Sequence, residues 1–180
     1  SWINDVSGFA NPDMVAAVRN SDCKLVVMHS LSVPADKNII LPLDCDPVEL
    51  LIDWAKVRFD ELEKAGIERS RIIFDAGIGF GKSAQQSMVI IEGVVRFKEL
   101  GVPLLIGHSR KSFLESCHSE LVEESLHYKT KSKDISHSFD MTKPVDDKDD
   151  ATIKISQFLA ENGVDYLRVH NVRRHRLEVL

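Results

Sequence analysis

Polar residues able to bind or react with a ligand follow each of five short apolar runs in this 180-residue chain. They are Asn4, His29, Asp75, Ser109 with Lys111, and Arg168 with His170. The carboxylate of Asp75 can accept two N–H bonds from one edge of an amino-heterocycle, and Asn4 can offer a donor and an acceptor to a neighbouring edge. This pair predicts recognition of a pterin or purine edge. The alternatives are a helix cap or turn at Asp75 and a strand-end Asx turn at Asn4.

Two further groups of residues predict an anion site. Ser109, Arg110 and Lys111 lie where an apolar run meets a helical pattern, and two cations plus a hydroxyl at a helix N-terminus favour an anion. Arg168 and His170 are two residues apart on one strand, so we expect them to point to the same side. Arginine with histidine suits a phosphate or diphosphate. Either group alone could be an unrelated surface pair, but together they favour one shared anionic ligand that also carries a ring.

The glycine-rich segment from Asp75 to Ser83 ends in Gly-Lys-Ser, the order found in a phosphate-binding P-loop. A P-loop needs glycine six residues before its lysine, and Ala76 stands there. The ionised carboxylate of Asp75 would also repel a phosphate. We therefore interpret these glycines as positions of close backbone approach, to a flat ligand or to a packed neighbour.

The elements that must position these residues alternate between strand and helix. Strands are predicted at 2–3, 25–28, 71–74, 104–106 and 164–169. Helices are predicted from Asn11-Pro12, from Asp46-Pro47, over 88–100 and 150–162, and from Asn171 onward. Repeated strand–helix–strand order predicts a parallel sheet with right-handed crossovers.

Two α/β architectures fit this order, an open doubly wound sheet and part of a (β/α)8 TIM barrel. An open sheet builds its site at one switch point from few strands, whereas loops after many strands converge in a barrel. Every predicted strand ends in a polar group, so we favour the barrel. A whole barrel takes roughly 250 residues, so about the last five βα units are present. The start at Ser1, without Met and inside a strand, predicts three preceding units; the alternative is a processed or tagged N-terminus.

The composition excludes several classes of protein. A net charge of -5 gives no reason to expect a nucleic-acid partner. The apolar runs are strand-sized, far below the roughly 20 residues that span a membrane, so no membrane partner is expected. Cys23, Cys45 and Cys117 show no CxxC spacing, which indicates a reduced, cytoplasmic protein.

The stretch 117–147 breaks the alternation because it is polar and weakly patterned. A structureless segment of that length is unusual inside a compact domain, so we expect an inserted loop. Its histidines, His118, His127 and His137, are nine or ten residues apart, which matches no compact metal motif.

Taken together, the chain resembles dihydropteroate synthase, a family of pterin-binding barrels, over nearly all of its length outside that insertion. The matching segments, in the family's order, are Ile3–Gly8, Val27–His29, Asp75–Lys82, Gly107–Ser112 and Arg168–Val172. The segments Ser-Arg-Lys-Ser and Arg-Val-His distinguish this family from the related methyltetrahydrofolate methyltransferases, which share the Asn-Asp and Asp-x-Gly segments.

The resemblance implies condensation of 6-hydroxymethyl-7,8-dihydropterin diphosphate with 4-aminobenzoate, giving 7,8-dihydropteroate and pyrophosphate in folate biosynthesis. It implies that Asn4 and Asp75 hold the pterin and that Met28 lines its pocket. It further implies that Lys111 bridges the two substrates, that Phe80 and Ser109 contact the aminobenzoate, and that Arg168 and His170 hold the diphosphate. The implied catalytic residues are Lys111, Asp75, Arg168 and His170. Mg²⁺ is the implied cofactor, with its main ligand expected in the part preceding Ser1, and the resemblance allows a homodimer and a fused upstream pyrophosphokinase domain.

Three departures from the family pattern bear on these expectations. Ala76 stands where the family usually has proline, and Asn171 where it usually has aspartate. The family's first three strands, with part of the metal and diphosphate site, have no counterpart here. We therefore expect the 180 residues alone to be inactive or to aggregate, and the full-length parent to be active. Two alternatives remain: a truncated or degenerate pterin-binding domain without activity, and a methyltetrahydrofolate methyltransferase-type domain.

Overall fold

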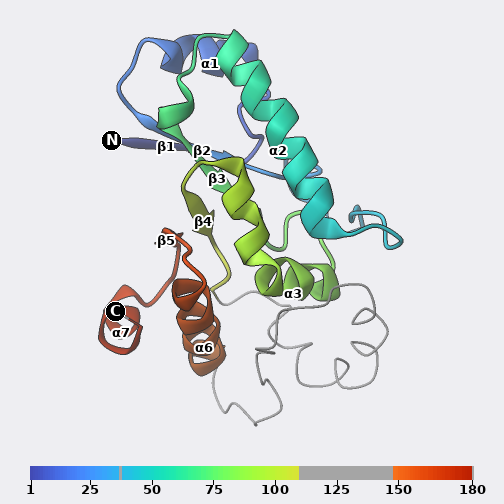
Figure 1. The fold of residues 1–180 in the computed structure, drawn as a ribbon, viewed down its shortest axis with the longest axis vertical. Coiled ribbons are helices and arrows are strands. Elements are labelled where there is room, and N and C mark those ends of the chain that lie inside the picture. Colours follow the sequence, from blue (N-terminus) through green and yellow to red (C-terminus); the bar gives the residue numbers. More distant parts are fainter. Residues whose placement is uncertain (37, 110–147, 180) are drawn as a thin grey trace.

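The computed structural model describes residues 1–36, 38–109 and 148–179. Strands and helices alternate along the chain (Figure 1). The strands are β1 (Trp2–Asp5), β2 (Lys24–Met28), β3 (Ile72–Asp75), β4 (Leu104–Ile106) and β5 (Tyr166–Leu167). The helices are α1 (Pro12–Arg19), α2 (Pro47–Lys64), α3 (Ala84–Glu92), α6 (Lys148–Glu161) and α7 (Val172–Glu178), with short 3₁₀ helices at Arg69–Arg71 and Val94–Leu100.

The five described strands form one parallel sheet in the order β1-β2-β3-β4-β5. Each crossover therefore leads to the next strand in the same direction, with no reversal of the kind that defines an open doubly wound sheet. The sheet also curls. This is shown by Trp2 of the first strand, which packs edge-on against Tyr166 of the last strand with 4.6 Å between ring centroids. The predicted partial (β/α)8 barrel is thus confirmed.

Side chains alternate between the two faces of the curled sheet. Leu25 and Val27 of β2 and Phe74 of β3 belong to the main core, which the helices cover from outside. Figure 1 shows α2 lying along this side of the sheet, with α3 near the lower end of α2. Val26, Ile73 and Leu105 form a separate small cluster on the opposite, concave face, which is the inside of the barrel.

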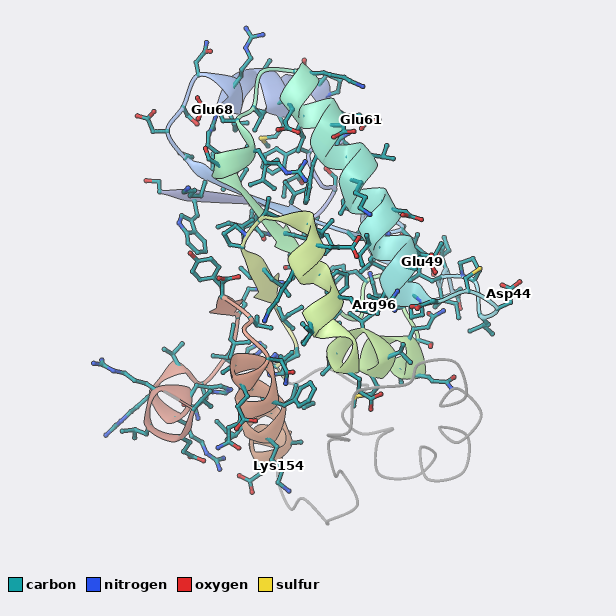
Figure 2. All side chains as sticks on the ribbon, in the orientation of Figure 1. Asp44, Glu49, Glu61, Glu68, Arg96 and Lys154 are labelled. Carbon is teal, nitrogen blue, oxygen red and sulfur yellow. The ribbon has the colours of Figure 1, made fainter. Side chains whose placement is uncertain are left out.

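The long helix α2 is fixed against the sheet by contacts at its start and along its inner face. Asp46 caps it by accepting from the backbone N–H groups of Val48 and Glu49, and Arg96 pairs with the same carboxylate from across the layer. Phe59 on its inner face packs edge-on against Phe74 of β3, with 6.0 Å between centroids. Figure 2 shows Glu49 and Glu61 along the outer side of this helix, as expected for an amphipathic helix on a barrel.

Two predicted elements differ in detail from those observed. The helix predicted over 88–100 is divided at Gly93 into α3 and the 3₁₀ helix Val94–Leu100. An added side chain at Gly93 would come within 2.9 Å of Val48. The helix also begins earlier than predicted, at Ala84, where Ser83 and Gln86 form a reciprocal capping box. The last strand, predicted over 164–169, is limited to Tyr166–Leu167.

Asn171 has a clear structural use at the start of α7. Its side chain accepts from the backbone N–H of Arg174. Asparagine caps a helix about as well as aspartate, so this departure from the family pattern keeps the local structure. Among the described helices, none has the length and apolar character that crossing a bilayer requires.

Candidate active site

The register of the sheet brings the inward-pointing side chains to one end of the barrel. Met28 lies opposite Asp75, and Asp75 lies opposite Leu105. Both Met28 and Asp75 are the last residues of their strands. The carboxyl ends of parallel barrel strands are where such folds build their sites, so the predicted residues are on the expected rim.

Asp75 is fully buried at this rim. Its Oδ1 accepts from the backbone N–H of Gly77 at 2.8 Å, so one oxygen does form the turn considered as the alternative role. Its Oδ2 lies 2.9 Å from Nη2 of Arg168. That contact is an ion pair without hydrogen-bond geometry, and Oδ2 makes no hydrogen bond within the described structure. One carboxylate oxygen therefore points toward the inside of the barrel with its acceptor capacity unused.

Arg168 joins three strands at this point. Besides the contact with Asp75, its Nη1 donates to Oδ1 of Asn4 at 3.3 Å. Its guanidinium also lies across Gly107, where a side chain would meet Nη2 at 2.5 Å. The Asn4, Asp75 and Arg168 side chains, predicted to share one cavity, are therefore in contact, although 164 residues separate the first from the last.

A second polar pair lies at the ends of β4 and β5. The backbone N–H of His170 donates to Oγ of Ser109 at 3.3 Å, and its Nδ1 lies 3.0 Å from the same oxygen. Ser109 is buried while His170 is exposed. Lys111, the remaining predicted catalytic residue, lies outside the described residues, as do Arg110 and the predicted insertion 117–147.

A cavity of about 950 Å³ opens on the concave face beside these residues. Its wall is mostly apolar and includes Met28, Leu105 and Phe80. Its polar members include Asn4, Asp165, Arg168, His175 and Arg176. Asp75, Ser109 and His170 are not part of its wall; Arg168 stands between Asp75 and the open space. A cavity of this size and character suits a flat ring with a few specific hydrogen bonds.

The strand-end Asx turn expected as an alternative at Asn4 belongs instead to its neighbour. Asp5 accepts from the backbone N–H groups of Ser7 (3.0 Å) and Phe9 (2.9 Å) and from the Ser7 hydroxyl (2.7 Å). Phe9 takes a positive φ of 60° within this turn. Asp5 thereby fixes the chain after β1 and leaves the Asn4 side chain for Arg168. The order Asp5-x-Ser7-Gly8 in the sequence could have predicted a turn at Asp5 instead of at Asn4.

The lysine of the P-loop-like segment is buried in its own loop. Lys82 Nζ donates to the carbonyls of Gly77 (3.0 Å) and Phe80 (2.9 Å) and lies 3.0 Å from Nδ1 of His29. Burial, followed by the charge of Lys82, lowers the pKa of His29 from 6.5 to about 3. The imidazole is therefore neutral at pH 7, and Nδ1 accepts from the ammonium. This lysine holds the loop, in agreement with the rejection of a nucleotide-phosphate site.

Among the described residues, no group of three or more His, Cys, Asp or Glu side chains is placed to hold a metal ion.

His108, next to Ser109, is fully buried on the helix side of the sheet. Its Nε2 lies 2.9 Å from Oγ of Ser156, so it joins β4 to α6. Cys23 is a free thiol, the Cys45 thiol donates to Oδ1 of Asp44 at 3.7 Å, and Cys117 lies outside the described residues.

Comparison with known proteins agrees with this geometry. Residues 1–170 match the family model described as "Pterin binding enzyme". The chain is 36% identical to the folate synthesis bifunctional protein of Chlamydia trachomatis over 177 residues, which is 97% of this chain and 34% of that protein. It is 33% identical to a probable bifunctional folylpolyglutamate synthase/dihydropteroate synthase of Halobacterium salinarum, covering 94% of this chain and 18% of that protein.

Solved structures match the fold over the same extent. Dihydropteroate synthase of Anaplasma phagocytophilum, with bound 6-hydroxymethylpterin-monophosphate, aligns with a TM-score of 0.76 at 31% identity, covering 99% of this chain and 61% of that one. The Xanthomonas albilineans enzyme with 4-aminobenzoic acid gives 0.72 at 26% identity, covering 99% and 55%. The chain thus spans about a third of the chlamydial relative and rather more than half of these solved chains. The chain forms a partial barrel and belongs to the pterin-binding enzyme family.

Proposed function

We propose that the protein containing this chain is a dihydropteroate synthase, which joins 6-hydroxymethyl-7,8-dihydropterin diphosphate to 4-aminobenzoate and releases pyrophosphate. The observation that carries the proposal is the meeting of Asn4, Asp75 and Arg168 beside a largely apolar cavity on the concave face of the sheet. An acceptor for ring N–H groups and a cation for an anion are thus side by side, as a pterin diphosphate requires.

In this proposal the pterin ring takes over the contacts that Arg168 now makes. Oδ2 of Asp75 would accept from the ring's N–H groups, and the Asn4 amide would pair with a neighbouring edge. Met28, which ends β2 and lines the cavity, would contact the ring face. Arg168, released from the carboxylate, would be free to bind the diphosphate.

The chemical step needs charge stabilisation more than proton transfer. The aminobenzoate nitrogen forms a bond to the pterin methylene carbon, the bond from that carbon to the diphosphate oxygen breaks, and pyrophosphate leaves with the electron pair. The amine then loses a proton. Arg168 and His170 would stabilise the charge that develops on the leaving group, while Lys111 would bridge the substrates. Phe80 and Ser109 would orient the aminobenzoate ring, which needs positioning rather than activation.

We further propose that Mg²⁺ binds to the diphosphate of the substrate. Mg²⁺ prefers several oxygen ligands, and the described residues gather no such set. Mg²⁺ would bind through the diphosphate oxygens, water and one or two protein carboxylates, and it would supply charge stabilisation to the leaving group. A second folate-pathway activity in the same polypeptide, as in the bifunctional relatives, and a homodimer complete the proposal.

The test is 4-aminobenzoate-dependent release of pyrophosphate from the pterin diphosphate, using the longest reading frame that contains this chain. Turnover that is lost in Asp75→Asn and retained in Asp60→Asn, a change on the exposed side of α2, would support the proposal. Pterin binding without turnover in the unaltered protein would favour a degenerate binding domain instead. Methyl transfer from a methyltetrahydrofolate would favour the other alternative.

A further inference from the structure

Lys82 is an ionisable side chain with an uncommon environment. It is only 7% exposed, and a buried ammonium is costly unless its donors are met by acceptors. Three acceptors lie within 3.0 Å, the carbonyl oxygens of Gly77 and Phe80 and the Nδ1 atom of His29. Two of them belong to the loop after β3, and the third follows β2. The ammonium therefore ties the loop to the neighbouring strand end.

The loop is pressed against that strand end as closely as its backbone allows. Gly77 has a φ of +64°, and a side chain on it would stand 1.9 Å from the carbonyl oxygen of His29. The N–H of Phe80 donates to the carbonyl of Gly77 at 2.9 Å, which closes a turn. The same Gly77 carbonyl also accepts from Lys82. Loss of the ammonium would leave two buried or half-buried carbonyls to find new partners, at the expense of this turn.

Asp75 and Phe80 depend on this loop to different degrees. Asp75 ends a strand, and its position is fixed by pairing with Met28 and Leu105 on both sides. Phe80 belongs to no strand or helix, and its side chain lines the cavity. The position of Phe80 therefore depends on the loop conformation, whereas the position of Asp75 is set by the sheet.

We propose that Lys82 is a positioning residue for the second substrate: its ammonium, bound by the Gly77 and Phe80 carbonyls and the His29 ring, holds Phe80 in the cavity where an aromatic carboxylate must lie. The inference rests on the proposed function, because it assigns Phe80 to the 4-aminobenzoate side of the site. Lys82 touches neither substrate in this account. It acts through the loop, so its loss should affect one substrate much more than the other.

The decisive variant is Lys82→Met, which keeps an unbranched apolar stem and removes the ammonium. The expected result is a rise in KM for 4-aminobenzoate of roughly 10-fold or more, with the Kd of 6-hydroxymethylpterin, measured by calorimetry, changed by less than about 3-fold. Lys56→Met is the matched control, since Lys56 is exposed and forms a surface ion pair with Glu99; it should leave both values unchanged. Lys82→Arg, which restores donors in a bulkier form, should fall between Lys82→Met and the wild type.

A second measurement tests the geometry without activity. In the wild type the His29 ring, followed by NMR, should titrate with a pKa near 3. In Lys82→Met this pKa should rise yet remain below 6.5, because burial is the larger cause of the shift. An unchanged His29 pKa would overturn the inference, since Lys82 would not then contact the ring.

Equal losses for both substrates, with a lowered unfolding temperature, would overturn it by showing that Lys82 is needed only for folding. Unchanged KM and Kd would overturn it as well. Failure of the proposed function would look different: the wild type itself would release no pyrophosphate. The His29 titration would then still decide whether Lys82 fixes the loop.

Discussion

The guanidinium of Arg168 neutralises the carboxylate of Asp75 across the inside of the barrel, with 2.9 Å between Nη2 and Oδ2. The pair links the predicted anion-binding residue to the predicted ring-binding residue. A ligand that uses the acceptor on Asp75 must therefore separate the two, and it gains most if it also offers an anion to the released arginine. Recognition of the ring and of the diphosphate should be energetically coupled.

Arg168→Met should remove that coupling. We expect the diphosphate form of the pterin to lose roughly 10- to 100-fold in affinity, about 1.5–3 kcal/mol for lost charged hydrogen bonds. Uncharged 6-hydroxymethylpterin should bind equally well or more tightly, because nothing then competes for Asp75. Calorimetry with both ligands measures the difference. Arg173→Met, an exposed change on α7, should affect neither, and a parallel loss for both ligands would contradict the coupling.

Asp75→Asn should weaken pterin binding by roughly 100-fold, about 2–3 kcal/mol. The asparagine Oδ1 can still accept from Gly77, so the turn survives, but an amide N–H₂ replaces the inward-facing acceptor. Fluorescence titration of the pterin would measure the loss. Circular dichroism should show a folded variant; a binding loss explained by unfolding would remove the case for a direct contact.

Acid should destabilise the protein partly through His29. Its pKa is near 3 in the folded chain and near 6.5 when unfolded, so between these values the unfolded state binds a proton that the folded state does not. Stability then falls by about 1.4 kcal/mol per pH unit as pH drops through this window, and the effect is absent above 6.5 and complete below 3. Urea unfolding of His29→Gln should lack this component between pH 6.5 and 4.5. Equal pH slopes for variant and wild type would contradict the buried neutral imidazole.

Gly77→Ala should destabilise the fold by at least about 2 kcal/mol, because the new methyl group would overlap the His29 carbonyl in addition to the strain of a positive φ. Gly101→Ala provides the matched control: its φ is +66° with nothing within 4 Å of the added carbon, so only the backbone strain of about 1 kcal/mol should appear. Calorimetric unfolding of both would separate the two contributions. Equal losses would mean that the loop after β3 can move away from β2.

The sequence alone predicts most of the strands and helices of this protein and the polar residues at the strand ends. Alternating apolar runs and capped helical patterns predict the strands, their parallel direction and the helices starting at Asn11 and Asp46, because these signals act over a few residues. The polar residue at each strand end, which belongs to the same local pattern, predicts the rim of the barrel as the site. Asn4, Asp75 and Arg168 could therefore be predicted from the sequence.

Tertiary structure decided what those residues do to one another. That Arg168 rests on Asp75 depends on the curl of five strands, which only the assembled sheet defines. That Lys82 is buried against His29 depends on a loop pressed onto a neighbouring strand 53 residues away, so its Gly-Lys-Ser order alone could not reveal its role. Local patterns choose the elements because their energies are local, whereas contacts among charges are decided by distances that exist only after the chain has folded.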